Sequence, residues 1–248
     1  MKIGILTFHR ATNYGAILQA YALIQYLINQ GYDAKIVDYK PKGMGILYAP
    51  INVPGFLKKI KRIVLNLLML PSLLTRYKKR EMFWKYINKV LPMTDIVLSS
   101  GDLPRMDAYI VGSDQVWRPR YNRLLDASFL IFTTNSRKIA YAASFGTDKW
   151  EFNEQQTAAY SKAIRQFRAI GVREQSAITL CKDYWDVDVT LVLDPTLLLT
   201  AEEYFPLLNK SNKQNHVFTY ILDSESWKRV AVKSICIQKQ ICELAGMY

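Results

Sequence analysis

One stretch near the N-terminus, Lys2–Leu27, most restricts the folds open to this chain. It begins with a short apolar run, Lys2–Phe8, which has the composition of a strand buried on both faces. A polar hinge, His9–Gly15, follows. Apolar residues then recur at three- and four-residue steps up to Leu27, the spacing of the buried face of a helix. Asn13 stands where the N-cap of that helix belongs. The stretch therefore predicts a strand, a hinge and a helix in immediate succession.

With the segment that follows, the first strand and helix are predicted to form a βαβ unit. Gly31 ends the predicted helix, and Asp33–Tyr39 has the apolar character of a second strand. A strand, a helix and a strand within so short a span favour a parallel sheet of the α/β, Rossmann-like class. Further predicted strands are Asp107–Val111, Lys138–Ala143, Ala169–Val172, Val189–Leu193 and His216–Leu222. Further predicted helices are Glu151–Phe167, Gln175–Lys182 and Trp227–Leu244.

Two more helices are predicted on either side of Pro71, at Phe56–Leu70 and Leu73–Val90. The first combines four basic side chains with an apolar stripe, which makes it a basic amphipathic helix. Docking on the sheet is one interpretation of residues 56–70, and peripheral contact with an anionic membrane is the other. Both stay open on the sequence alone.

Composition narrows the classes of partner. The 248 residues carry a formal charge of +12, which favours anionic partners such as phosphorylated small molecules or anionic lipids. Nucleic acid is disfavoured because no helix-turn-helix, RRM, KH or zinc-finger signature is present. The three cysteines, Cys181, Cys236 and Cys242, form no C-x-x-C pair, so neither a disulfide scaffold nor a metal site is expected.

The compartment is predicted from the same features. Three thiols fit a reducing compartment, and no signal peptide precedes the first strand. The longest apolar run, Ile63–Leu70, is far shorter than the roughly 20 residues that span a bilayer. We therefore expect a soluble, cytoplasmic protein.

Polar or small residues follow each predicted strand, and the carboxyl ends of parallel strands share one edge of a sheet. Ligands of open α/β sheets bind outside that edge. We therefore expect a site there. The catalytic candidate is Asp114. The substrate-binding candidates are His9, Asn13, Tyr14, Gly15, Ser113, Trp117, Ser144 and Arg173.

Each of these candidates also has a purely structural interpretation. Asp114, directly after a strand, suits a base that accepts a proton from a sugar hydroxyl, or it caps a short helix. Arg173 suits a phosphate or carboxylate, or it pairs with Glu174 or another neighbour. Trp117 stacks on a sugar or base, or it packs in the core. Asp194 is expected mainly to end a strand before Pro195.

The hinge itself has two interpretations. The helix that starts near Gly15 directs unpaired N–H groups and the positive end of its dipole towards the sheet edge, which favours an anion. Alternatively, Gly15 only permits close packing of helix and strand. The stretch is neither a G-x-G-x-x-G fingerprint nor a P-loop, so it predicts no dinucleotide or ATP site. His9 falls at the edge of the expected site, whereas His216 opens a strand and is expected to be structural.

Six segments, taken in order, resemble the polysaccharide pyruvyl transferase family. They are KIGILTFHRATNYGAILQAYAL, VDYKP, DAYIVGSDQVWRP, KIAYAASFG, GVREQSA and VLDPTLLL, and they cover about residues 2–199. The resemblance implies two Rossmann-like domains in a GT-B-like plan. It also implies transfer of a pyruvyl group from phosphoenolpyruvate to a sugar hydroxyl pair, as a ketal, in capsule or exopolysaccharide biosynthesis. Phosphoenolpyruvate is then a co-substrate, no cofactor is expected, and the acceptor is a sugar or a lipid-linked oligosaccharide.

The sequence departs from the family pattern after these segments. Members continue through a second domain with a histidine in an Arg- or Ser-Phe-containing segment, expected to act as the acid, and no such segment occurs here. We therefore expect an N-terminal domain over 1–205 and the start of a truncated second domain over 206–248. That start should pack poorly and expose apolar surface. A GT-B-like glycosyltransferase and a non-catalytic binding module stay open as alternatives.

Overall fold

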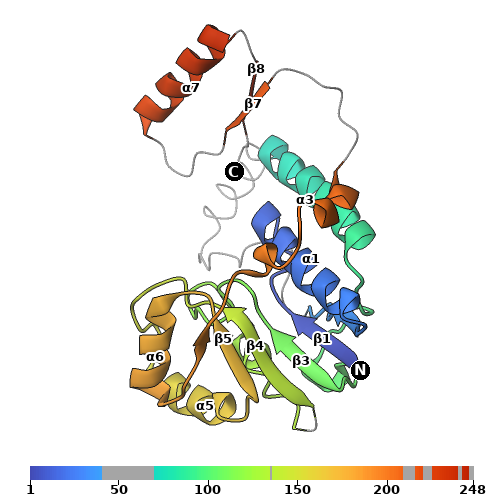
Figure 1. Cartoon of the computed structure of the whole chain (residues 1–248), viewed down its shortest axis with the longest axis vertical. Helices are drawn as coiled ribbons and strands as arrows, with labels where there is room; N and C mark the ends of the chain where they lie inside the picture. Colours follow the sequence, from blue (N-terminus) through green and yellow to red (C-terminus); the bar gives the residue numbers. More distant parts are fainter. Residues whose placement is uncertain (41–69, 135, 209–215, 220–224, 240–241, 246–248) are drawn as a thin grey trace, which may run out of the picture. The chain divides into compact units, whose positions relative to one another are not determined.

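The structure is a computed structural model of the chain (Figure 1). It describes residues 1–40, 70–134, 136–208, 216–219, 225–239 and 242–245. The chain divides into two compact units, Met1–Glu203 and Tyr204–Tyr248. The first unit contains the sheet and all the candidate site residues, and each unit is described by itself.

The first unit is built on a six-stranded, entirely parallel sheet with the strand order β2-β1-β3-β4-β5-β6. Its strands are β1 (Lys2–Leu6), β2 (Asp33–Ile36), β3 (Ala108–Val111), β4 (Arg137–Ala143), β5 (Ala169–Val172) and β6 (Thr190–Leu191). All six coincide with strands predicted from the sequence, although β1, β2, β3 and β6 are shorter. The α/β, Rossmann-like fold class is therefore confirmed.

Helices connect these strands, as the βαβ pattern requires (Figure 1). The longer ones are α1 (Tyr14–Asn29), α3 (Leu70–Val90), α5 (Glu154–Ile164) and α6 (Gln175–Trp185), and α4 (Leu125–Ser128) is a single turn. Three 3-10 segments lie at Ser100–Asp102, Pro195–Leu197 and Glu202–Leu207. Capping explains two of the helix starts, because Asn13 caps α1 and Asn153 forms a capping box with Gln156 at α5.

Both faces of the sheet are covered. Tyr109 and Val111 of β3 belong to a core that includes Ile164 of α5 and Leu180 of α6. Ile110, between them in sequence, points to the other face because successive side chains alternate across a strand, and it is 6% exposed. The buried helix residues Ile17 and Leu23 of α1 lie outside that core. This arrangement explains why the central strands β1 and β3 are continuous apolar runs rather than alternating ones.

The predicted helices around Pro71 are only partly described. Most of Phe56–Leu70, with its basic amphipathic pattern and the membrane contact considered for it, lies outside the described residues. The predicted start of the second helix at Leu73 is wrong, because the described part of α3, Leu70–Val90, already includes Pro71. None of the helices among the described residues is long and apolar enough to cross a membrane.

The second unit contains β7 (His216–Thr219), α7 (Ser226–Lys239) and β8 (Cys242–Ala245), with β7 and β8 parallel. The prediction of one helix over Trp227–Leu244 is wrong at its end, because residues 242–245 form a strand. Apolar side chains of α7 are exposed, among them Trp227 at 62% and Ile237 at 77%. Such exposure agrees with the expectation that one βαβ unit buries little apolar surface of its own.

Candidate functional site at the carboxyl edge of the sheet

The strand order places a topological switch point between β1 and β3. From β1 the chain passes to β2 on one side, and later returns to β3 on the other side of β1. The connections leaving β1 and β3 therefore diverge at the carboxyl edge, which is where open α/β sheets bind ligands. The hinge after β1 and the Gly112–Asp114 turn after β3 both start at this point.

The start of α1 faces this edge and is capped by its own hinge. The Asn13 Oδ1 accepts hydrogen bonds from the Gly15 N–H at 2.8 Å and from the Ala16 N–H at 3.3 Å, so the predicted N-cap is confirmed. Gly15 is exposed, and a Cβ placed on it would meet only Asn13 Oδ1 within 4 Å. Gly15 is therefore not needed for close packing of helix and strand, which leaves its space open to another molecule.

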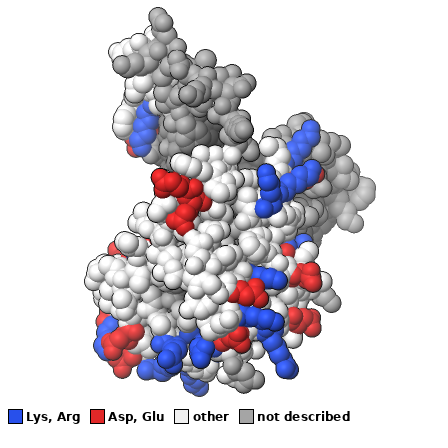
Figure 2. Space-filling model, turned by 45° about the vertical axis from the view of Figure 1, so that its right-hand side comes forward, with Lys and Arg blue, Asp and Glu red and all other residues white. Residues whose placement is uncertain are grey.

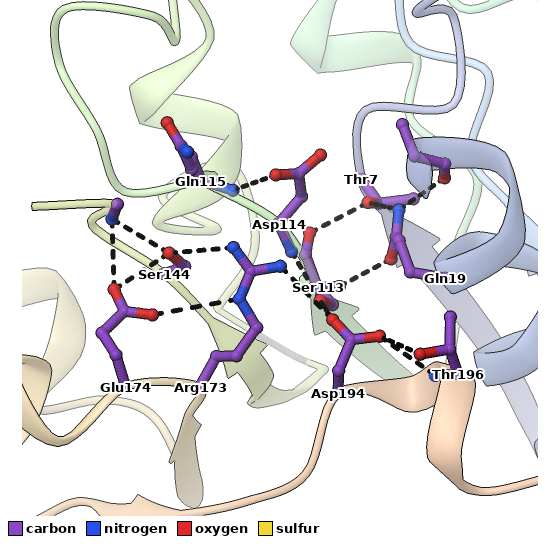
Figure 3. Close-up of polar contacts among 12 residues, drawn as sticks. Thr7, Gln19, Ser113, Asp114, Gln115, Ser144, Arg173, Glu174, Asp194 and Thr196 are labelled. Carbon is purple, nitrogen blue, oxygen red and sulfur yellow. Dashed lines mark hydrogen bonds and ion pairs between the residues drawn. The ribbon is translucent and has the colours of Figure 1, made fainter. Parts of the chain in front are cut away.

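The Gly112–Asp114 turn is held between β3 and α1. Gly112 and Asp114 both have positive φ values, 112° and 79°, and a Cβ on Gly112 would collide with the Tyr141 backbone oxygen. Gln19 on α1 fixes the turn by accepting from the Ser113 N–H at 3.1 Å, while its own amide donates to Thr7 Oγ1 at 2.8 Å (Figure 3). Positive φ at a non-glycine residue is costly unless such contacts enforce it.

Asp114 presents its carboxylate beside this turn. Oδ1 accepts from the Gln115 N–H at 2.8 Å, and the other oxygen accepts no hydrogen bond from a described residue. Figure 3 shows the carboxylate directed away from the ion pairs of Arg173. No helix begins at Asp114 in the described chain, so the helix-cap interpretation does not apply. A half-buried carboxylate with one uncommitted oxygen has the geometry that a general base requires.

Arg173, directly after β5, is anchored at the centre of the network. Its Nη1 donates to Asp194 Oδ2 at 3.3 Å and its Nη2 donates to Ser144 Oγ at 3.3 Å, while its Nε lies 3.9 Å from Glu174 Oε2 (Figure 3). The side chain is still 31% exposed. A guanidinium has more donors than these contacts use, so Arg173 is oriented by carboxylates and can still donate to an anion.

Ser144 and Glu174 form the wall next to Arg173. The Glu174 Oε1 accepts from Ser144 Oγ at 2.9 Å and from the N–H groups of Phe145 at 2.8 Å and Gly146 at 3.1 Å. The pairing of β4 with β5 shifts register between Ala140 and Ala143. Such a bulge re-aims the residues that follow it, here Ser144 and its loop.

Asp194, after β6, connects the two halves of the network. Its Oδ2 accepts from Ser113 Oγ at 3.1 Å and from Arg173, and its Oδ1 accepts from the Thr196 N–H and hydroxyl at 3.0 and 2.8 Å. Burial alone pushes the pKa of Asp194 up, but the bonds from Thr196, Arg173 and Ser113 outweigh it and hold the pKa below its ordinary value. The carboxylate is therefore ionised and fixes both Ser113 and Arg173.

His9 lies at the same edge but inside the protein. It is 4% exposed, and its Nε2 and Nδ1 contact Asp38 Oδ1 at 2.9 Å and the Thr7 carbonyl oxygen at 3.1 Å. Arg10 donates to both oxygens of Asp38 at 2.6 Å. Burial pushes the pKa of Asp38 up, but the bonds from His9 and Arg10 outweigh it and hold the pKa below its ordinary value. Both ring nitrogens of His9 are thus engaged within the protein.

Two aromatic candidates have different surroundings. Trp117 is fully buried, stacked on Phe129 with ring centroids 5.5 Å apart, and its indole N–H donates to the Ser128 carbonyl. This burial favours the packing alternative for Trp117. Tyr14 is 64% exposed and its ring lies 4.8 Å from that of Phe83 on α3. Tyr14 is therefore accessible at the rim of the hinge.

The structure thus brings Ser113, Asp114, Ser144 and Arg173 into one network, with the capped hinge beside it (Figure 3). Sequence reasoning missed Gln19, Thr7, Glu174 and Asp194 as parts of this site. Gln19 carried a detectable signal, because it is a polar residue among apolar ones on the predicted buried face of α1. Glu174 and Asp194 also carried one, since each follows a strand like the residues that were chosen.

The surface around the sheet has mixed charge. Figure 2 shows basic and acidic side chains side by side over the lower part of the face that it draws. No group of three or more His, Cys, Asp or Glu side chains suited to a metal ion occurs among the residues that the structure describes. The candidate site is therefore built from an oriented arginine, two hydroxyls, three carboxylates and a capped helix start.

The fold is that of a Rossmann-like α/β protein, and the candidate site joins polar and charged side chains that follow β3 to β6 at the carboxyl edge of its sheet. Residues 13–241 match the family model for polysaccharide pyruvyl transferase, which spans well over half of the chain. The chain belongs to the polysaccharide pyruvyl transferase family. Membership implies a sugar or polysaccharide acceptor. No match was found among curated proteins.

Proposed function

We propose that this chain takes part in the transfer of a pyruvyl group from phosphoenolpyruvate to a pair of sugar hydroxyls, as a ketal, in capsule or exopolysaccharide synthesis. Family membership supports the transferase class. The observation that carries the proposal is the network at the carboxyl edge, where the oriented Arg173 and the uncommitted oxygen of Asp114 lie around one turn.

The steps of the reaction define which chemical groups the site must supply. Protonation of the methylene carbon of phosphoenolpyruvate makes the second carbon electrophilic, and one sugar hydroxyl adds there while its proton passes to the base. Inorganic phosphate leaves, and the second hydroxyl closes the ketal with loss of its proton. The site therefore needs an acid, a base, and donors for the phosphate and carboxylate groups.

The described residues supply part of this set. Asp114 has an oxygen free to accept a hydroxyl proton. Arg173 suits the phosphate or the carboxylate of phosphoenolpyruvate. The Gly15 and Ala16 N–H groups are bonded to Asn13 Oδ1, so the start of α1 contributes the positive end of its dipole rather than free donors. His9 is engaged with Asp38 and lies below this surface, so its proposed contribution is to hold the hinge in place. The acid is assigned to the family's histidine segment, which has no match in these residues.

The test separates binding from transfer. Binding of phosphoenolpyruvate is measured calorimetrically on the 248-residue chain. Transfer is measured on a fusion that supplies a second domain with the histidine segment, by phosphate release and by the ketal methyl signal. Asp114→Asn keeps a residue type that tolerates positive φ but cannot take the proton. It should leave binding unchanged and lower transfer by about 10²- to 10⁴-fold, the usual contribution of a general base.

The matched control is Asp33→Asn, which removes an exposed acid from the opposite edge of the sheet and should leave transfer unchanged. Full transfer by the Asp114→Asn fusion would remove Asp114 from the chemistry. Release of nucleoside diphosphate from a nucleotide sugar, with no phosphate from phosphoenolpyruvate, would identify a glycosyltransferase instead. Sugar binding without any turnover by the fusion would identify a binding module.

A further inference from the structure

A hollow of about 210 Å³ lies outside the network described above. Three segments of the first unit line it: the hinge after β1, the residue four positions after β2, and one side of α3. The lining residues are Arg10, Thr12, Lys40, Arg80, Glu81, Phe83, Trp84 and Ile87. The hollow therefore opens at the carboxyl ends of β1 and β2, beside the buried His9–Asp38 pair.

The charges of this hollow do not cancel. Arg10 is paired with Asp38 through both oxygens, and Glu81 is paired with Lys85 at 2.9 Å. Lys40 and Arg80 form no ion pair with any residue that the structure describes. Three cations thus line one small space with a single carboxylate, that of Glu81, which Lys85 already holds. This excess of positive charge favours a ligand with two adjacent negative charges.

The wall of the hollow is held in place by contacts of Arg10 and by the packing of α3. The Arg10 guanidinium is held by the Asp38 carboxylate and lies over the Trp84 ring, 4.2 Å from the ring centroid. Phe83 and Ile87 are 8% and 1% exposed, so α3 is well packed at this point. The exposed Thr12 adds a hydroxyl at the rim. A preorganised wall lowers the entropic cost of holding a ligand.

We propose that this hollow binds a diphosphate group, held mainly by Lys40 and Arg80 against the Arg10–Trp84 wall. Arginine binds phosphate oxygens through its planar fork and lysine acts as a point charge, so the pair suits a group with several adjacent oxygens. The site goes beyond the proposed function and stands on its own residues. From β1 to β5 there are three strand spacings, so the hollow and Arg173 are separated by roughly 14 Å of sheet.

The test is chemical modification of the Lys40 side chain, a measurement that does not depend on catalytic activity. The whole chain is acetylated in limiting reagent with and without inorganic diphosphate, and the extent of modification at Lys40 is measured by mass spectrometry. Lys78, exposed on α3 and outside the hollow, is the internal reference. Diphosphate should slow acetylation of Lys40 and leave that of Lys78 unchanged. Equal acetylation of Lys40 with and without diphosphate would overturn the proposal.

Two variants make the assignment specific. Arg80→Gln should raise the half-protecting diphosphate concentration at least about tenfold, which is the loss expected for a charge-assisted contact. Lys78→Gln removes the same charge from the same helix and should leave this concentration within about twofold. Protection in Arg80→Gln equal to that in the unaltered chain would overturn the role of Arg80.

A third variant keeps this site distinct from the proposed phosphoenolpyruvate site. Arg173→Gln should leave the protection of Lys40 by diphosphate unchanged, whether or not phosphoenolpyruvate binds at Arg173. Loss of protection in Arg173→Gln would assign the effect to the other site and overturn the proposal.

The source of the diphosphate is tested by two soluble esters, a nucleoside diphosphate and a short prenyl diphosphate. Protection by both at similar concentrations supports recognition of the diphosphate alone. Protection by one of the two esters at a lower concentration than the other supports the same site and identifies the group that carries the diphosphate. Protection by neither ester would overturn the proposal for esterified ligands.

Discussion

Two charged clusters lie at the carboxyl edge of the same sheet, and they differ in what their charges are free to do. In the cluster after β1 and β2, Asp38 is 2% exposed and accepts hydrogen bonds from Nε and Nη2 of Arg10, and it is also bonded to His9. In the cluster after β3 to β6, Arg173 is 31% exposed and Asp114 keeps one carboxylate oxygen uncommitted. The first cluster is closed and the second has capacity left for a ligand.

The comparison distinguishes residues that stabilise the fold from residues that are available to a ligand at the same edge of the sheet. A closed, buried cluster such as that of Asp38 holds the hinge and the end of β2 together, and breaking it should mainly affect stability. The half-exposed cluster contains a positive φ at Asp114 and an arginine oriented by two carboxylates, features found where groups are preorganised for ligands. Variants in the two clusters should therefore affect different measurements.

Among the variants that separate the two clusters, Asp38→Asn should have the largest effect, and the quantity that it changes is stability. Loss of the charge leaves Arg10 and His9 facing an amide in a buried site, so the free energy of unfolding should fall by about 3 kcal/mol. Chemical denaturation monitored by tryptophan fluorescence measures this change. Asp95→Asn, which alters an exposed acid on a neighbouring segment, should change it by less than about 0.5 kcal/mol. Equal stability of both variants would contradict the supporting role of Asp38.

The next effect concerns the open cluster. Arg173→Gln should weaken binding of phosphoenolpyruvate by about 1.5–3 kcal/mol, the scale of a charge-assisted hydrogen bond, and should change stability much less than Asp38→Asn. Calorimetric titration measures the binding. Arg168→Gln is the matched control, because Arg168 precedes β5 and is exposed at the opposite end of the same strand. Arg168→Gln should bind phosphoenolpyruvate like the unaltered chain, and equal affinity in both variants would exclude Arg173 from the site.

Sequence alone predicted the sheet because the pattern of its strands is local. Most of the six strands lie in short segments rich in apolar residues, and the cap at Asn13 is a contact between residues two and three positions apart. The strand Cys242–Ala245 was harder to predict from the sequence. It continues the apolar spacing of α7 and forms a strand only by pairing with β7. Helix and strand are not distinguished by so short a run.

The site was predictable in position but not in partners. That polar residues gather at the carboxyl edge follows from parallel strands, so Asp114 and Arg173 could be selected from the sequence. Their contacts could not, because Ser113 reaches Asp194 across 81 residues of chain. The burial of His9 and Trp117 could not be predicted from the sequence either. Burial of a side chain after a strand depends on neighbours elsewhere in the sequence, here Asp38 and Phe129.

The smallest expected effect is the part of the Asp38 contribution that depends on its proton. Because the pKa of Asp38 in the folded protein lies below its ordinary value, the carboxylate stabilises the fold fully above that ordinary value. Its contribution is lost as the pH falls below about 4 and through the folded-state pKa. The free energy of unfolding should therefore fall more steeply on acidification in the unaltered chain than in Asp38→Asn. Unfolding curves recorded from pH 7 down to pH 3 measure both slopes, and parallel slopes would show that the closed cluster contributes through shape rather than charge.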